Sequence, residues 1–400
     1  MRFTKPQLRG LLAMAFAHGT SDFYSGMVPL LIFTIVSAHR LSPLYQGAIG
    51  FLWYLTSSVV QPLFGAYSDR AGRWWFLPAS VGVTAVAVAF IGLSPGIGVL
   101  AALVIVGGLG SAVMHPEAGK YAALLSGARK SSGISIFQIG GAVGYAFGPV
   151  VIAYILQHSG THGSLWMIAP GVAGVAVLFV LMRGLDAHAQ RAQEAHRATL
   201  PPSGYVDRTG VGLLVLGTAL KYLVGASFMT YLPNLIVSRG GSIAQAGVVV
   251  TAFLAVGVIG LYLGGRLGDR YGALPIAVAS FIATAPVLYG FFAFGGVVSL
   301  GFLLLAGVLL NVQSAPSVAI VQRMLPRNLG MALGLMNGVA FGAGSALVTL
   351  VGFGVARIGA SGALLEVSAL PLACAITFWL AGRRLNDTRF TSVSKSVVVS

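Results

Sequence analysis

The sequence predicts an all-α membrane protein whose twelve transmembrane helices form two pseudo-symmetric bundles of six. Of the 400 residues, 56% are hydrophobic and only 8% are charged, whereas soluble domains carry about 25% charged residues. Apolar segments of roughly 20 residues, the length that crosses a bilayer, recur along the whole chain. A short charged motif also appears twice, each time between two apolar segments.

Each apolar segment is expected to be a helix, because lipid offers the backbone no hydrogen-bond partners. The first segment contains His18 and Asp22 and is too long for a signal peptide, so it is expected to remain in the protein. The only cysteine, Cys374, lies in the last segment and is interpreted as a packing residue. The twelve predicted spans are residues 9–35, 44–67, 75–94, 97–122, 131–155, 164–183, 210–237, 244–265, 273–294, 297–322, 329–355 and 363–382.

The apolar pattern is interrupted once at length, near the middle of the chain. A polar stretch follows Gly184, and Pro201 and Pro202 come after it, which is typical of a linker. We therefore expect an N-terminal six-helix bundle at residues 1–184 and a cytoplasmic linker at 185–208. Residues 209–400 are expected to form a C-terminal six-helix bundle with a short cytoplasmic tail.

The repeated motif relates the two bundles. Gly65–Arg73 (GAYSDRAGR) returns 200 positions later as Gly265–Gly272 (GRLGDRYG). The same offset places Pro116 of the fourth span opposite Pro316 of the tenth. These matches indicate a duplicated bundle. This architecture is typical of secondary transporters, in which the substrate site lies between the two halves.

The net charge of +15 is concentrated on one predicted side of the membrane. Of the 24 lysines and arginines, 19 lie in the two terminal segments and in the loops after even-numbered spans, and three lie on the opposite side. Cytoplasmic loops carry such an excess, so both termini are expected in the cytoplasm. This distribution argues against nucleic acid as the partner of the basic residues.

Six histidine, acidic and lysine side chains lie deep inside the predicted spans, away from the helix ends. Asp22 and Glu117 are the two acidic residues deep in the membrane, where a charge costs at least about 2.5–3.5 kcal/mol and normally faces a cavity and a partner. His18 lies four residues before Asp22 on the same helix face. All six residues fall in the first, fourth and seventh spans, and they are His18, Asp22, His115, Glu117, Lys120 and Lys221.

The duplicated motif resembles the Gly-x-x-x-Asp-Arg-x-Gly-Arg signature of the major facilitator superfamily; the second copy lacks the final basic residues and has Ala273. The resemblance implies the major facilitator fold, in which spans 1, 4, 7 and 10 line a central cavity. Parts of the first bundle are similar to the fosmidomycin resistance protein group of drug exporters, which implies proton-driven export of small anionic compounds. These parts are Ala17-His18, Ser21–Gly26, Pro29, Thr56–Pro62, His115–Glu117 and Ser135–Gly141.

Two roles follow for the residues inside the spans. Proton coupling is assigned to Asp22 and Glu117, because removal from water favours the neutral form of a carboxyl group, with His18 and His115 as relays. Substrate binding is assigned to two lysines, which would attract a phosphonate or carboxylate group, and to four polar side chains. These six are Lys120, Lys221, Tyr24, Gln138, Asn311 and Gln313.

Each assignment has a structural alternative. The carboxylate–lysine pair of the fourth span can seal its cytoplasmic end, and the histidine–aspartate pair of the first span can be a satisfied hydrogen bond. His115 can fill the backbone gap that Pro116 leaves, and Lys221 can extend towards the cytoplasmic surface. An aromatic residue such as Tyr24 can serve packing alone.

Gating is assigned to the two loop motifs, on the predicted cytoplasmic face. Asp69 and Asp269 are expected where the eleventh and fifth spans begin, respectively. Each carboxylate is expected to meet the positive end of a helix dipole and nearby arginines, and so to latch the halves together. The gating residues of these loops are Asp69, Arg70, Arg73, Asp269 and Arg270.

A glycine motif in the fifth span is also assigned to gating. Gly144, Gly148 and Pro149 form part of a motif found among facilitator antiporters, although Ser135 replaces its earlier glycine. The alternative is that these small residues let neighbouring helices pack closely.

The sequence thus predicts a proton-coupled secondary transporter that exports a small, anionic, phosphonate antibiotic-like compound by alternating access. One alternative is a proton-coupled importer of an organic anion or sugar phosphate. A distant alternative, an intramembrane enzyme using His115 and Glu117, is disfavoured because the sequence has no HExxH or Gly-x-Ser-x-Gly motif.

The expected partners follow from this function. They are the lipid bilayer, a small-molecule substrate and protons. No metal or cofactor is expected, because the proton gradient supplies the energy. The expected location is the bacterial inner (plasma) membrane, where the protein is expected to function as a monomer.

Overall fold

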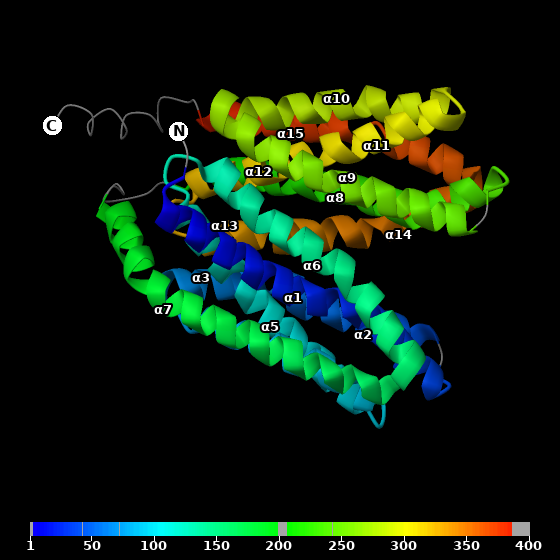
Figure 1. Cartoon of the computed structure of the whole chain (residues 1–400). Coiled ribbons are helices and arrows are strands. Elements are labelled where there is room, and N and C mark those ends of the chain that lie inside the picture. Colours follow the sequence, from blue (N-terminus) through cyan, green and yellow to red (C-terminus); the bar gives the residue numbers. More distant parts are fainter. Residues whose placement is uncertain (1–2, 42, 72, 199–205, 242, 386–400) are drawn as a thin grey trace. The chain divides into compact units, whose positions relative to one another are not determined.

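The computed structural model describes residues 3–41, 43–71, 73–198, 206–241 and 243–385, and every regular element within these ranges is helical (Figure 1). The elements are α1 (Lys5–Ala38), α2 (Pro43–Tyr54), the π-helix η1 (Leu55–Val59), α3 (Gln61–Ala71), α4 (Phe76–Phe90), the 3₁₀-helix η2 (Ile91–Leu93), α5 (Ile97–Leu125), α6 (Lys130–Ser159), the 3₁₀-helix η3 (Thr161–Met167), α7 (Ile168–Ala198), α8 (Arg208–Ser238), α9 (Ile243–Tyr271), α10 (Ala273–Ala293), α11 (Gly296–Val312), α12 (Ser314–Met324), α13 (Leu329–Leu333), the π-helix η4 (Gly334–Val339), α14 (Ala340–Val367) and α15 (Leu370–Leu385).

The prediction of twelve transmembrane helices is confirmed. Within the described residues, ten helical runs are long and apolar enough to cross a membrane. One of them, Leu329–Leu385, contains the last two predicted spans, which a non-helical Gly359 (φ 73°, ψ 167°) separates. The predicted span 44–67 is the remaining one, and it is divided among α2, η1 and α3.

Prolines account for two interruptions inside predicted spans. The π-helix η1 ends at Val59, three residues before Pro62. The proline ring clashes with the carbonyl group four residues earlier and widens the turn. The tenth predicted span breaks between α11 and α12, because Pro316 has no N–H group to donate to the carbonyl of Val312. By contrast, α5 continues through Pro116 without a break.

Two helix starts are fixed by side chains. Thr4 and Gln7 form a capping box at the start of α1. Asp207 caps α8, where its carboxylate accepts hydrogen bonds from the Gly210 amide (3.0 Å) and from Arg384 Nε (2.7 Å). Burial raises the pKa of Asp207, but these hydrogen bonds outweigh burial, so the pKa lies below its ordinary value.

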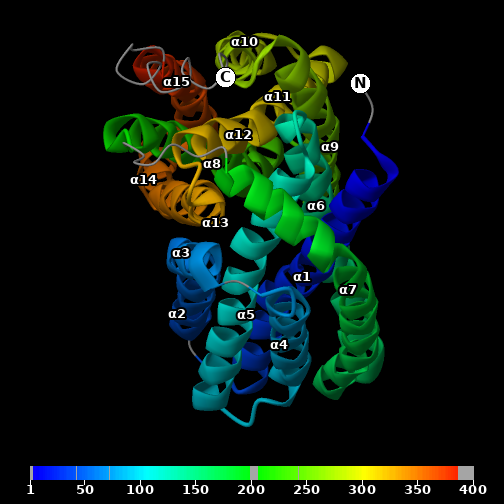
Figure 2. The ribbon, with the colours of Figure 1, turned by 90° about the vertical axis from the view of Figure 1, so that its left-hand side faces the viewer.

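The chain forms two compact units. The first unit comprises Met1–Gly127, Ile136–Thr199 and Arg327–Val339. In it, α1 packs against α4, α5 and α7, and these four helices run side by side in Figure 2. Its hydrophobic core includes Tyr24, Trp53 and Leu100.

The second unit comprises Ala128–Ser135, Leu200–Pro326 and Ala340–Ser400. In it, α8 packs against α14 and α15, while α11 packs against α9 and α10. Its core is rich in phenylalanine and includes Phe228, Phe253 and Phe291. The first turn of α6 therefore belongs to this unit, whereas α13 and η4 belong to the first.

The predicted linker at 185–208 overlaps the end of α7, which continues to Ala198. Residues 199–205 lie outside the described residues. The division into bundles at 1–184 and 209–400 therefore stays a prediction.

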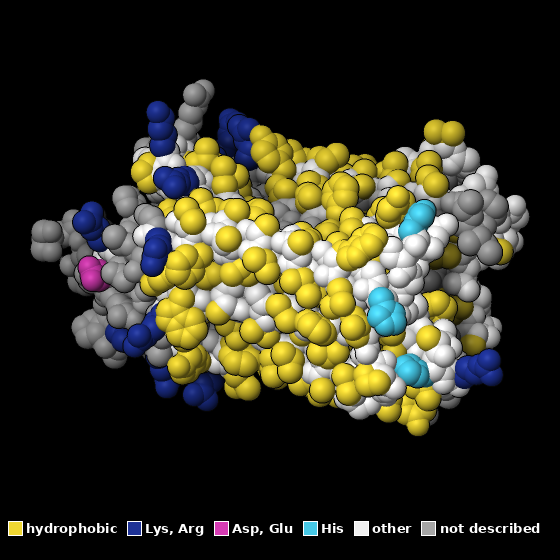
Figure 3. Space-filling view, turned by 60° about the horizontal axis from the view of Figure 1, so that its bottom comes forward, with side chains coloured by type: hydrophobic (Ala, Val, Ile, Leu, Met, Phe, Trp, Pro, Cys, Tyr) yellow, Lys and Arg dark blue, Asp and Glu magenta, His cyan; other side chains and the backbone are white. Residues whose placement is uncertain are grey.

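Large apolar side chains cover much of the surface. Leu63 is 72% exposed, Val150 67% and Val297 86%. The face in Figure 3 is mostly hydrophobic, and most of its lysines and arginines gather at one end. Soluble monomers rarely expose contiguous apolar patches larger than a few hundred Å². Such a surface fits lipid.

Candidate functional site

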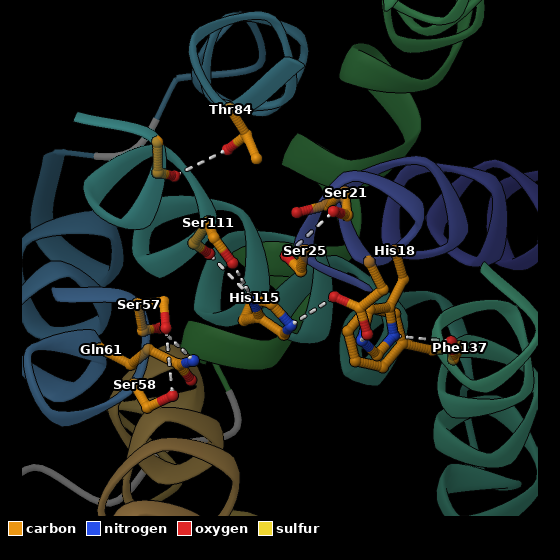
Figure 4. A network of polar contacts seen from close by, with 12 residues as sticks. His18, Ser21, Ser25, Ser57, Ser58, Gln61, Thr84, Ser111, His115 and Phe137 are labelled. Carbon is orange, nitrogen blue, oxygen red and sulfur yellow. Dashed lines mark hydrogen bonds and ion pairs between the residues drawn. The ribbon is translucent and has the colours of Figure 1, made fainter. Parts of the chain in front are cut away.

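The first polar cluster of the first unit joins α1 and α5. The two carboxylate oxygens of Asp22 meet one histidine each: Oδ2 lies 3.1 Å from His18 Nε2, and Oδ1 lies 3.2 Å from His115 Nε2. The side chains of His18, Asp22 and His115 are 8%, 16% and 13% exposed, respectively. The predicted contact between His18 and Asp22 is confirmed, and His115 joins it from another helix (Figure 4).

The other ring nitrogen of each histidine contacts a backbone carbonyl. His18 Nδ1 lies 2.9 Å from the oxygen of Phe137, and His115 Nδ1 lies 2.8 Å from the oxygen of Ser111. A carbonyl only accepts hydrogen bonds, so both Nδ1 atoms carry the hydrogen. The carbonyl that Pro116 leaves without a helical donor is that of Ala112, so His115 does not fill that gap.

The ring of His18 is held by α6. It stacks on Phe137 with a centroid distance of 4.1 Å and an angle of 23°. On α6, a Cβ added to Gly141 would collide with the imidazole atoms, so only glycine fits there. From the sequence, Gly141 stood out only as the last residue of Ser135–Gly141, one of the segments that carry the family resemblance.

The second polar cluster lies between α3 and α5 and is fully buried. Lys120 Nζ pairs with Glu117 Oε2 at 3.1 Å, as the spacing of three residues predicted. Ser68 completes the cluster: its hydroxyl donates to Glu117 and accepts from Lys120 Nζ (2.7 Å), while its carbonyl also accepts from Nζ (3.1 Å). Every polar group of this cluster therefore has a partner.

Lys221 is the buried cation of the second unit. Its residue is 8% exposed, its Nζ lies 3.4 Å from Ser314 Oγ, and it sits 4.3 Å from the centroid of the Tyr222 ring. Among the residues that the structure describes, no acidic side chain pairs with Lys221. This separates it from Lys120, whose charge is balanced by Glu117.

The other predicted substrate residues make mostly local contacts. Tyr24 is fully buried, and its hydroxyl donates to the carbonyl of Met167 at 2.6 Å. Asn311 Nδ2 donates to Gly307 O (2.9 Å) on its own helix, and Gln313 accepts from Ser317 Oγ at 2.5 Å. Gln138 is also buried, and its Oε1 has no hydrogen-bond partner among the described residues.

The two loop aspartates bind helix N-termini, as predicted. In the first unit, Asp69 accepts hydrogen bonds from the amides of Gly330 (3.0 Å) and Met331 (3.1 Å), at the start of α13. In the second unit, Asp269 accepts from the amides of Ser131 and Ser132 at the start of α6, both at 3.0 Å. The predicted contact of each carboxylate with the eleventh and fifth spans is confirmed.

The arginines of the loop motifs are more exposed than the two aspartates. Arg70, Arg73 and Arg270 are exposed. The arginine that lies near Asp269 is Arg129, whose Nε is 3.8 Å from the carboxylate. Because Arg129 precedes the fifth span and lies outside the repeated motif, the sequence analysis did not single it out.

The glycine motif of α6 lies against α1. A Cβ on Gly144 would meet the carbonyl oxygen of Gly19, and one on Gly148 would meet that of Phe23. Pro149 Cδ lies 3.1 Å from the position that a Cβ on Gly26 would take. These contacts favour close helix packing as one role of Gly144 and Gly148, and gating stays a prediction.

The helices, their apolar surface and the charged groups buried among them define a multi-pass membrane transporter. The family model described as Major Facilitator Superfamily matches residues 11–213 and again 214–397. The chain belongs to this superfamily. The double match agrees with the duplication seen in the sequence.

Two curated relatives cover nearly the whole chain. The first is an uncharacterized MFS-type transporter, YfnC, of Bacillus subtilis, 29% identical over 385 residues, with 92% of each chain covered. The second is the fosmidomycin resistance protein of Escherichia coli, 27% identical over 385 residues, with 94% of this chain and 93% of that protein covered. The resemblance to the fosmidomycin resistance group is therefore confirmed.

A solved structure supports the fold. The Escherichia coli fucose:proton symporter superimposes with a TM-score of 0.69, covering 94% of this chain and 97% of that chain, at 14% sequence identity. At that identity the likeness concerns the fold alone. Together these findings identify a secondary transporter and not an enzyme.

Proposed function

We propose that this secondary transporter exports a small anionic compound of the phosphonate class in exchange for protons, by alternating access. The observation that carries the proposal is the set of charged side chains buried in its membrane-spanning helices. Intramembrane charges usually serve substrate or proton pathways because their burial is costly. The similarity to the fosmidomycin resistance protein supports a phosphonate as the substrate class.

Lys221 supports an anionic substrate. Among the described residues, this buried ammonium group has no acidic partner, and an uncompensated charge inside a protein is unfavourable. A phosphonate or carboxylate group would balance it. The hydroxyl of Ser314, 3.4 Å from Nζ, is a second donor for the same anion.

Glu117 and Lys120 support coupling to protons. They are 0% and 3% exposed as residues and pair directly with each other. Protonation of Glu117 would remove the negative partner of Lys120 and free its charge for an anion. Proton and substrate would then occupy this cluster in turn, which is the requirement for exchange.

Asp22 is the second proposed proton site. Its two histidine partners offer a relay between α1 and α5, because imidazole changes charge near neutral pH. No cofactor is part of the proposal, since the proton gradient supplies the energy. We place the protein in a bacterial inner membrane, because its curated relatives are bacterial, and expect a functional monomer.

The proposal is tested in proteoliposomes that hold purified protein and an internal pH dye. Addition of fosmidomycin or another small phosphonate should evoke proton movement across the membrane. Glu117→Gln or Asp22→Asn should abolish this movement. The matched control is Glu366→Gln, because Glu366 is exposed, and it should leave proton movement unchanged.

Two results would contradict the proposal. A phosphonate that binds the protein without moving protons would exclude exchange. Cells that gain growth on an organic anion or sugar phosphate, and not resistance to a phosphonate antibiotic, would indicate import.

A further inference from the structure

His18, Asp22 and His115 place three metal-ligating atoms together. One ligand atom from each residue, an imidazole nitrogen or a carboxylate oxygen, lies within 4.8 Å of the other two. Two residues come from one turn of α1 and the third from α5, so the cluster depends on the packing of the first unit. Two histidines and one carboxylate are a ligand set that transition metals such as iron, cobalt and zinc accept.

The hydrogen bonds of the rings leave the correct nitrogen free. Both Nδ1 atoms donate to backbone carbonyls, those of Phe137 and Ser111. In a neutral imidazole the hydrogen is then on Nδ1 and the lone pair on Nε2. Both Nε2 atoms therefore present their lone pairs to the carboxylate of Asp22, an acceptor group as well. Metal-ligating histidines normally show this arrangement, in which the second nitrogen donates to a carbonyl or carboxylate.

Facing lone pairs repel each other, so a positive species must lie between these groups. Two protons, one on each Nε2, would satisfy Asp22 and give the cluster a net charge of +1. A single divalent cation bound to neutral His18, neutral His115 and ionised Asp22 gives the same net charge. The helices around the cluster would therefore enclose the same net charge whether two protons or one divalent cation is bound.

The distances also fit a metal ion. Zinc lies about 2.0–2.2 Å from nitrogen and oxygen ligands, which places ligand atoms roughly 3–3.5 Å apart in tetrahedral or octahedral geometry. The contacts of Asp22 with the two histidines are 3.1 and 3.2 Å. These contacts involve different carboxylate oxygens, and the three ligand atoms lie within 4.8 Å of one another, so the two imidazoles must move closer together to bind one ion.

We propose that His18, Asp22 and His115 form a binding site for one divalent transition metal ion, such as Zn²⁺ or Co²⁺. This inference goes beyond the transport function and depends on neither its direction nor its coupling. A bound ion would occupy the carboxylate proposed as a proton site. The metal would therefore compete with protons and inhibit exchange.

The test is direct binding to purified protein in detergent, without its affinity tag and after treatment with a chelator. Titration with Co²⁺, followed by its visible absorption, and with Zn²⁺, followed by calorimetry, should give one site per chain. His18→Ala, His115→Ala and Asp22→Asn should each weaken binding at least about tenfold. His158→Ala is the matched control, because His158 is exposed at the end of α6, where it contacts the carbonyl and the ring of Tyr154 and lies outside the proposed site.

A variant that keeps all three ligands tests the geometry. In Gly141→Ala the new methyl group would meet the ring of His18 and displace it. Binding should weaken by about 10–100-fold, as for other changes beside metal ligands. X-ray absorption of the wild-type Zn²⁺ complex should show scattering from two imidazoles. This measurement uses only the wild-type protein, so it does not depend on whether any variant folds.

Three outcomes would overturn the proposal. The first is the absence of stoichiometric binding to the wild-type protein. The second is binding that the three ligand variants leave unchanged, which would indicate an adventitious site elsewhere. The third is a Zn²⁺ complex without imidazole scattering. Substrate and proton gradients are absent from these measurements, so failure here would leave the proposed transport function untouched.

Discussion

At the scale of single residues, Ser68 explains how Glu117 and Lys120 can be buried together. Removing two charges from water costs more than their attraction returns unless further hydrogen bonds satisfy them. The hydroxyl of Ser68 donates to the carboxylate and accepts from the ammonium group, and its carbonyl accepts a second hydrogen bond from Nζ. Glu117, Lys120 and Ser68 together therefore carry no net charge, and their polar groups hydrogen-bond to one another.

This balance predicts strong non-additivity between the two charged residues. Lys120→Met should destabilise the protein by about 3–5 kcal/mol, because it leaves the Glu117 carboxylate buried without its cation. The double variant Lys120→Met with Glu117→Gln should be more stable than Lys120→Met alone. Thermal unfolding of Lys120→Met, Glu117→Gln and the double variant in one detergent measures this. Unfolding temperatures that fall additively would contradict it.

Sequence spacing predicted residue contacts within a helix but not between helices. The pairs His18–Asp22 and Glu117–Lys120 follow from separations of four and three residues. His115 and Ser68 join these pairs because α5 packs against α1 and α3 in a particular rotation. That rotation depends on the shapes of many side chains, so no local spacing reports it.

At the scale of helices, the packing of α6 on α1 depends on glycine. Gly148→Ala should lower the unfolding temperature, because the added methyl group meets the carbonyl of Phe23 and overpacking typically costs about 1–3 kcal/mol. The control is Gly301→Ala in α11, where, in the part of the chain that the structure describes, the added atom would meet nothing within 4 Å beyond its own stretch of helix. That substitution should be neutral or stabilising, since alanine favours helix by about 1 kcal/mol. Equal unfolding temperatures for the two variants would argue against glycine-dependent packing.

The start of α13 is held by Asp69, whose carboxylate accepts two backbone amides. In Asp69→Asn the charge is lost and one amide faces an NH₂ group, so the N-terminus of α13 should be released more often. A cysteine placed at buried Leu329, with Cys374→Ser removing the native thiol, should then react faster with a maleimide. We expect an increase of several-fold.

Asp269→Asn provides the matched control for this experiment, because it changes the equivalent carboxylate at the start of α6. It should leave the reactivity of a cysteine at Leu329 unchanged. If Asp69→Asn labels no faster than the parent, the hydrogen bonds of Asp69 do not hold α13. The gating role assigned to this carboxylate would then lose its structural basis.

Helix interruptions were predictable only in part. Pro62 and Pro316 each explain a break inside an apolar segment. The helices α1, α5, α6, α8 and α10 continue through a proline, so proline alone would not have located these two breaks. The π-helix η4 contains no proline and has two glycines, Gly334 and Gly338, that lie against the backbone of α3 and η1. It arises from contacts with another helix, and the hydropathy of its own segment does not contain that information.

At the scale of the whole molecule, composition and duplication were sufficient for the class. Low charge, twelve apolar segments and a motif repeated after 200 residues led to a two-bundle membrane transporter, and the superfamily match covers each half separately. The composition of the two units was not predicted. Residues Ala128–Ser135 and Arg327–Val339 cluster with helices far away in the sequence, through contacts such as those of Asp69 and Asp269.

For the proposed exchange of a dianion for a proton, charge movement across the whole membrane favours export. Export of a dianion in exchange for one proton moves three positive charges inwards. An interior-negative potential of 100 mV therefore contributes about 7 kcal/mol to export, whereas one pH unit contributes about 1.4 kcal/mol per proton. Import of the same dianion would need several co-transported protons to overcome the potential.

Efflux of a phosphonate from preloaded proteoliposomes should therefore respond more strongly to voltage than to pH. With equal pH on both sides, valinomycin and an outward potassium gradient impose an interior-negative potential, which should accelerate efflux. Equal potassium concentrations should slow it, and protein-free vesicles should show neither effect. A carrier works reversibly, so the orientation of the inserted protein does not change the sign. An efflux rate that ignores the imposed potential would mean that the exchanged charges cancel, and voltage could then not set the direction of transport.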